Sequence, residues 1–246
     1  LTKFVLPSNN QVGISGFGFS AHEILPALML GLDVKALLEG LLNLPGELAA
    51  HIAGIQYLSY QKDRNINVIF SISNSLKGFN SWIKFRFRQA LATVQTGPFI
   101  ETAIATTDFH SIIEGILNGP NVVLSIFIKI LEEGNVIGPI ADGQFASHLV
   151  PDFVLGNTIK DISDKFHLAA NRALTNENRL NFTIKIPRLD ERSIGSLFAL
   201  FDMAAANLEG LLKTQHSSSP VELGRQKVLF SVLSSYPDRL VEEVKD

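Results

Sequence analysis

Residues 67–73, NVIFSIS, decide the fold class of this 246-residue chain. The run is rich in β-branched and aromatic residues and shows no alternation of polar and apolar positions. This pattern is typical of a strand covered on both faces, as in a parallel sheet between two layers of helices. The Ser-Asn-Ser at its end, residues 73–75, predicts a cap for the next helix, supplied by Ser73 or Asn74.

A helix is predicted over residues 75–92, directly after this strand. Its apolar residues recur at helical spacing and face a core, while its basic residues fall on the other side. The run KFRFR, residues 84–88, is therefore interpreted as one buried and one solvated face rather than an RNA-binding patch. The core face holds Leu76, Phe79, Trp82, Ile83 and Phe87, and the outward face holds Lys77, Lys84, Arg86 and Arg88.

Strands and helices alternate along the rest of the chain. Such alternation implies right-handed parallel crossovers. We therefore expect an α/β fold, a three-layer αβα sandwich with a mainly parallel sheet of about five strands. The predicted elements are strands at 99–107, 121–131 and 180–187, a helical turn from His110, a helix opened by Asn157 with the apolar stripe Ile159, Ile162, Phe166, Ala170 and Ala173, a helix from Ser193 to Leu212, and a last helix from about Val221.

The first sixty residues read as a lead-in to this sheet. A short opening strand and loop at 4–20 precede a capping box formed by Ser20 and Glu23, at which a helix begins. Helical hairpins continue to residue 60, with Gly31, Gly40 and Pro45–Gly46 as punctuation. We expect residues 1–60 to form a helical lead-in segment and residues 61–246 to form the α/β domain.

Composition excludes several classes of function. The formal net charge of -3 provides no basic footprint for nucleic acid. The chain has no cysteine, which excludes disulfides and thiolate metal sites and is compatible with a cytoplasmic location. Residues 24–58 are apolar, but four charged residues interrupt them, so no membrane span is predicted. The six histidines show no metal-ligand spacing, and no metal or cofactor is expected.

Residues 106–111, TTDFHS, carry the main candidate for chemistry. His110 follows a predicted parallel strand, at the edge where open α/β sheets bind ligands, and imidazole titrates near neutral pH. The alternative is that Asp108 or Thr107 caps a helix and His110 is a first-turn surface residue. Pattern alone favours the capping interpretation.

Several stretches together resemble the C-terminal half of bacterial phosphoglucose isomerases, proteins built from two sugar-isomerase (SIS) domains. Their order and spacing, more than any single motif, carry the resemblance. The stretches are FVLPSNNQVG (4–13), ILPALMLGLDVKALLEG (24–40), SLKGFNSWIKF (75–85), TGPFIETAIATTDFHS (96–111), LNFTIKIPRLDERSIGSLFALFDMAAANLEG (180–210) and PVELGRQ (220–226).

The resemblance implies a flavodoxin-like SIS fold and, for the family, aldose–ketose isomerisation between glucose 6-phosphate and fructose 6-phosphate. It places His110 at the position of the family's ring-opening histidine, with Thr107 of the same motif as a substrate contact. It also implies a homodimer and a missing N-terminal SIS domain, whose loop grips the substrate phosphate in the family.

The other site positions depart from the family's pattern. Gln89 stands where the family has the carboxylate that moves a proton between C1 and C2, and an amide is not basic near pH 7. Arg225 stands where a lysine contacts the ring oxygen, and its high pKa makes it a poor proton donor. Glu114 replaces one family glutamine, and Ser218 or Ser219 replaces another.

These departures predict a domain that is inactive or incomplete as this chain stands. Two alternatives remain open: a non-catalytic SIS domain that binds a sugar phosphate as a sensor, or one that serves only in assembly. Glu101 and Glu114 are the two carboxylates considered as replacements for the base that the family has at position 89. For Glu114 an exposed ion pair with His110 is the more ordinary explanation.

Overall fold

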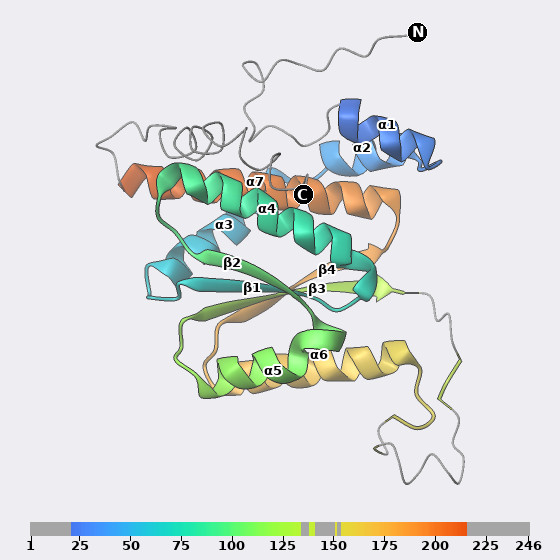
Figure 1. The fold of residues 1–246 in the computed structure, drawn as a ribbon, viewed down its shortest axis with the longest axis vertical. Helices are drawn as coiled ribbons and strands as arrows, with labels where there is room; N and C mark the ends of the chain where they lie inside the picture. The colour runs from blue at the N-terminus through green and yellow to red at the C-terminus, as the bar shows by residue number, and fades with distance from the viewer. Residues whose placement is uncertain (1–20, 134–137, 141–150, 152–153, 216–246) are drawn as a thin grey trace, which may run out of the picture.

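The computed structural model describes residues 21–133, 138–140, 151 and 154–215, and they form a parallel sheet between two layers of helices (Figure 1). All strand pairs are parallel, and the order is β2-β1-β3-β4. The α/β sandwich is confirmed, with four strands in the described residues instead of about five. The opening strand predicted within 4–20 lies outside them. The strands are β1 (Ile66–Ser71), β2 (Phe99–Ile104), β3 (Val123–Glu132) and β4 (Asn181–Arg188).

The two faces of the sheet are covered unequally (Figure 1). Helices α3 (Gly46–Tyr60), α4 (Lys77–Val94) and α7 (Glu191–Gln215) cover one face, and α5 (Ala105–Asn118) and α6 (Ile159–Asn176) cover the other. Two short helices, α1 (Ala21–Met29) and α2 (Val34–Leu42), lie further out, with α2 packed against α7.

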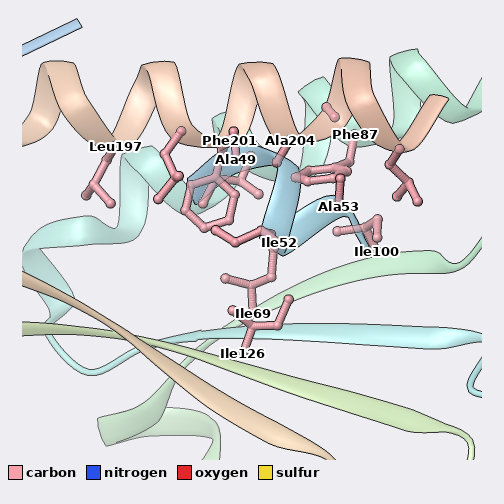
Figure 2. Packing of buried hydrophobic residues seen from close by; sticks show 14 of the residues in the cluster. Ala49, Ile52, Ala53, Ile69, Phe87, Ile100, Ile126, Leu197, Phe201 and Ala204 are labelled. Atoms are coloured by element: carbon pink, nitrogen blue, oxygen red, sulfur yellow. The ribbon is translucent and has the colours of Figure 1, made fainter. Parts of the chain in front are cut away.

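Strand β1 separates two hydrophobic cores because its successive side chains point to opposite faces. Ile69 belongs to the core under α3, α4 and α7, whereas Val68 and Phe70 belong to the core under α5 and α6. In the first core, Ile52 of α3 points toward Ile69 and Ile126 of the sheet (Figure 2). Burying one such side chain contributes about 2 kcal/mol.

Capping side chains set several helix boundaries, and the sequence predicts their positions to within about three residues. Ser73 acts as a cap, but of a 3₁₀ turn, Asn74–Leu76, where its side chain accepts from the Ser75 amide; α4 itself begins at Lys77 without a side-chain cap. Two other predicted caps were wrong by one and three residues. Thr158, not Asn157, forms a capping box with Asp161, and Asp190, not Ser193, caps α7 by accepting from the Ser193 amide at 2.8 Å.

Helix α4 also differs from its predicted two-faced pattern. Leu76, Phe79, Ile83 and Phe87 are buried as expected, and Trp82 is half-buried. Arg86, predicted to point outward, is buried and pairs with Asp202. The reason is that α7 packs along this side of α4, so a face that would be solvated on an isolated amphipathic helix is covered. The carboxylate of Asp202 compensates the buried charge.

Gly40, predicted as punctuation, lies inside α2 at a close crossing with α7. A Cβ atom at Gly40 would lie 1.9 Å from the Arg192 carbonyl oxygen, and one at Gly195 would lie 2.0 Å from the Leu37 carbonyl oxygen. The Ser196 hydroxyl donates to the Gly40 carbonyl at 3.0 Å, and Arg192 pairs with Glu39. The two glycines therefore let the helix backbones touch.

Within the part of the chain that the structure describes, α7 alone is long and apolar enough to cross a membrane by length and composition. Leu197, Phe201, Leu208 and Leu212 on its inner face are fully or almost fully buried in the core. Its apolar character is thus explained by packing.

Replacing Gly195 with alanine should destabilise the fold by about 1–3 kcal/mol, because the methyl group forces α2 away from α7. Gly210→Ala is the matched control, since Gly210 lies in the same helix and a Cβ atom there meets nothing within 4 Å. We expect that variant to be stabilised by about 0.5–1 kcal/mol through helix propensity. Urea unfolding measures both, and equal effects of the two substitutions would contradict the close crossing.

His167 on α6 is a buried titratable side chain on the opposite face. Its Nε2 lies 3.1 Å from the Thr183 hydroxyl and 3.1 Å from the Asn171 amide nitrogen, and its ring meets Phe127 edge-on. Burial, with a smaller contribution from the charge of Lys129, lowers the pKa of His167 below its usual 6.5. The neutral imidazole is therefore the form that the fold favours.

A pH dependence of stability follows from this burial. Between the lowered folded pKa and 6.5 the unfolded chain binds more protons at this site, so stability is lost as pH falls below about 6.5. We expect the melting temperature to fall between pH 7.5 and 5.5 and the fall to be smaller in His167→Gln. His51→Gln, at an exposed position of α3, should retain the full dependence. Identical pH profiles for all three proteins would refute the assignment.

Candidate functional site

The strand order creates a topological switch point between β1 and β3. From β1 the chain moves to β2 on one side, and then to β3 on the other. In open α/β sheets, ligands bind at the carboxyl ends of the strands at such a point. The serine-rich turn 71–75 and the end of β3 meet there.

Side chains at this edge bind one another. The Ser71 hydroxyl donates to Asn80, whose amide nitrogen donates to the Ala103 carbonyl at 3.1 Å. The Ser73 hydroxyl donates to the Glu133 carboxylate. The serine turn thus joins β1 to α4 and β3, and a carboxylate beside Ser73 disfavours a bound phosphate by like charge.

A groove of ≈ 630 Å³ lies beside this edge, between α5 and α6. Its size is in the range of small-molecule pockets, but its lining is mainly apolar. The apolar stripe predicted on α6 lines this groove, with Ile159 53% and Phe166 49% exposed; Ala170 alone of the five is buried. The lining consists of Ile72, Ala105, Thr107, Phe109, His110, Ile113, Glu114, Ile159, Ile162, Ser163, Phe166, Ala169, Ala170 and Ala173.

His110 and Thr107 line this groove with exposed side chains. The His110 side chain is 92% exposed, and its Nδ1 lies 3.8 Å from Glu114 Oε1, which is ion-pair distance but too long for a hydrogen bond. Glu114 is itself 68% exposed. These side chains are free to meet a ligand, but nothing in the described residues holds them in a catalytic geometry.

The neighbours of His110 in the TTDFHS motif have structural roles. Helix α5 begins at Ala105, so the strand predicted to reach 107 ends at Ile104, and His110 lies in the second turn instead of the first. Asp108 Oδ2 accepts from the Ile104 amide at 2.8 Å, which anchors the helix start. Phe109 packs against Phe70 with ring centroids 5.3 Å apart. The helix-start interpretation therefore holds for Asp108.

The structure does not bring Gln89 to His110. Gln89 is half-buried on α4, which covers one face of the sheet, while α5 covers the other (Figure 1). Gln89 is absent from the groove lining. Ser218, Ser219 and Arg225 lie outside the described residues.

Glu101, one of the two carboxylates considered as a replacement base, is held in ion pairs. It pairs with Lys84 at 2.6 Å and Arg88 at 3.1 Å on the α4 side of the sheet. Burial raises the pKa of Glu101, but hydrogen bonds from Lys84 and the Thr102 amide outweigh it, so the pKa is lowered. No three His, Asp or Glu side chains among the described residues gather as a metal site.

Sequence comparisons place these observations in context. This chain is similar to bacterial glucose-6-phosphate isomerases. It is 26% identical to the Staphylococcus saprophyticus enzyme over 82% of the chain and 47% of the relative, and 26% identical to that of Rubrobacter xylanophilus over 82% and 49%. The Synechococcus enzyme is also 26% identical, over 98% of this chain and 47% of its own length. The chain therefore spans about half the length of the curated relatives it matches.

Structural comparison supports the fold alone. The hypothetical protein TT0462 from Thermus thermophilus superposes with a TM-score of 0.67 at 20% identity, over 86% of this chain and 53% of that one. No family profile matches the chain.

We expect alanine substitutions at Asp108 and His110 to differ in their effect on stability. Asp108→Ala should cost about 1 kcal/mol, because the α5 start loses its acceptor for the Ile104 amide. His110→Ala should change stability by less than about 0.5 kcal/mol, because the imidazole is almost fully exposed. Chemical denaturation of both variants tests this, and a comparable loss in His110→Ala would reveal a structural role for the histidine.

Proposed function

We propose that this chain corresponds to the C-terminal SIS domain of a glucose-6-phosphate isomerase-like protein and that it is non-catalytic or incomplete by itself. The observation that carries the proposal is sequence similarity over 82% of the chain to relatives of twice its length. In this proposal residues 1–60 lead into the SIS-like domain of residues 61–246. An N-terminal SIS domain, a homodimeric state and a cytoplasmic location belong to the same proposal.

Loss of the proton-transfer base supports the inactive state. Isomerisation needs a group that removes a proton from carbon, and the amide of Gln89 has no basic form near neutral pH. Glu101 lies in a salt-bridge network, and Glu114 is exposed on the helix surface. Burial raises the pKa of Glu101, but hydrogen bonds from Lys84 and the Thr102 amide lower it overall, which makes this carboxylate a weaker base.

An incomplete site also agrees with the exposure of His110. A ring-opening histidine acts on a sugar that is held in place, since positioning supplies much of the rate enhancement. The groove beside His110 is mainly apolar, and the described residues that line it include no Lys or Arg side chain to pair with a phosphate group. In our proposal, the phosphate contacts come from the N-terminal domain, and Arg225 supplies an anion or hydroxyl contact.

Enzyme assays test this proposal directly. The 246-residue chain should convert neither glucose 6-phosphate nor fructose 6-phosphate above the uncatalysed background in coupled assays. Turnover that His110→Ala abolishes would overturn the proposal. Contaminating host isomerase is identified by turnover that survives this substitution unchanged.

An NMR titration with fructose 6-phosphate separates an incomplete enzyme from a sensor. We expect chemical-shift changes confined to the neighbourhood of Thr107, His110 and Glu114. These changes should not saturate at about 1 mM ligand, so that binding is weaker than about -4 kcal/mol. Saturable binding well below about 1 mM without turnover would replace our proposal with the sugar-phosphate sensor. His110→Ala serves as the control for specificity.

A further inference from the structure

Helix α3 has its polar and apolar faces partly reversed. Gln56 and Ser59 on its inner face are buried, and their side chains have no hydrogen-bond partner among the described residues. Its outer face carries Leu48, Ile55 and Leu58, which are 50%, 37% and 60% exposed. Residues seven and ten positions apart share one side of a helix, so these three form a stripe, the α3 stripe. A helix with such an outer face is typical of one that is covered on both sides.

The sequence after α7 contains a matching apolar stripe. Between Pro220 and Pro237, apolar residues from Val228 onward recur at the spacing of one helical face, and from Gln226 onward the positions off this face are serine or polar, apart from Phe230. A proline near the start and a proline after the end are typical boundaries of a helix. The stripe consists of Val228, Leu229, Val232, Leu233 and Tyr236 and is called the tail stripe.

The end of α7 lies beside the end of α3. A Cβ atom at Gly97 would meet Leu212 Cδ1 at 2.8 Å, which places the last turns of α7 against the turn before β2. The Tyr60 hydroxyl at the end of α3 lies 3.0 Å from the Thr96 hydroxyl of the same turn. The chain therefore leaves α7 close to the Leu58 end of the α3 stripe. Residues 216–220 reach up to about 17 Å when extended, which is enough for a helix that begins near Val221 to turn back along α3.

We propose that residues 228–236 form a helix whose tail stripe packs against the α3 stripe. Neither stripe contains a Lys, Arg, Asp or Glu residue, as the centre of a packed interface requires, and His51 lies between Leu48 and Ile55 on the same side of α3. A membrane surface fits the α3 stripe less well, because Lys35 is the one Lys or Arg residue in the sequence from 21 to 60, and anionic lipids attract basic clusters. The inference is independent of the isomerase-like function.

Thiol labelling of the full-length chain tests this docking, because the chain has no cysteine of its own. Leu58→Cys places a single thiol in the α3 stripe. Phe85→Cys is the matched control, since Phe85 on α4 is 63% exposed, close to the 60% of Leu58. We expect a maleimide to react about tenfold more slowly with Cys at position 58 than at position 85.

Second substitutions identify the segment that protects the thiol. Val232→Asp in the Leu58→Cys chain should raise the labelling rate to within about twofold of the Phe85→Cys rate, because it places a carboxylate in the tail stripe. Ser231→Asp, which lies off that stripe, should leave the protection intact. Equal rates at positions 58 and 85 in the unsubstituted tail would overturn the proposal. Protection that disappears on dilution, with a dimer in sedimentation, would show that a second copy covers the stripe and would overturn it as well.

Discussion

Burial of β1 on both faces is the constraint on which the rest of the molecule depends. A strand without a solvated face needs a helix layer above and below, and parallel neighbours on both edges. Each neighbour requires a crossover helix, and right-handed crossovers assign α4 to one face and α5 to the other. The separation of Gln89 from the His110 groove follows from this topology.

The two layers differ in how completely they are filled. On one face α3, α4 and α7 interdigitate around Ile69, Phe87 and Phe201, and α2 reaches α7 through paired glycines. On the other, α5 and α6 meet the sheet through Phe109 and Leu174 and leave a groove between them. Incomplete coverage at the carboxyl edge places a groove of ligand size beside the motif that carries His110.

Similarity to glucose-6-phosphate isomerases concerns the sequence of most of this chain, whereas the site geometry concerns the few residues around the groove. The similarity to the relatives extends over 82% of this chain, whereas the described residues that line the groove beside His110 include no Lys or Arg for a phosphate group. Core packing and catalysis depend on different residues, so similarity in fold does not by itself carry the chemistry of the relatives. The apolar outer stripe of α3 indicates in turn that some surfaces of this scaffold are built to be covered.

The sequence by itself determined the αβα architecture, because hydrophobic periodicity is a local consequence of which faces a segment buries. The run at 67–73 illustrates this, and so does the position of His110 in the helix that follows β2. Tertiary structure decided what covers each face. Arg86 is buried because α7 lies over it, Gly40 is a contact instead of a break, and Phe166 lines the groove between α5 and α6. These outcomes depend on the distances between helices, which no single segment encodes.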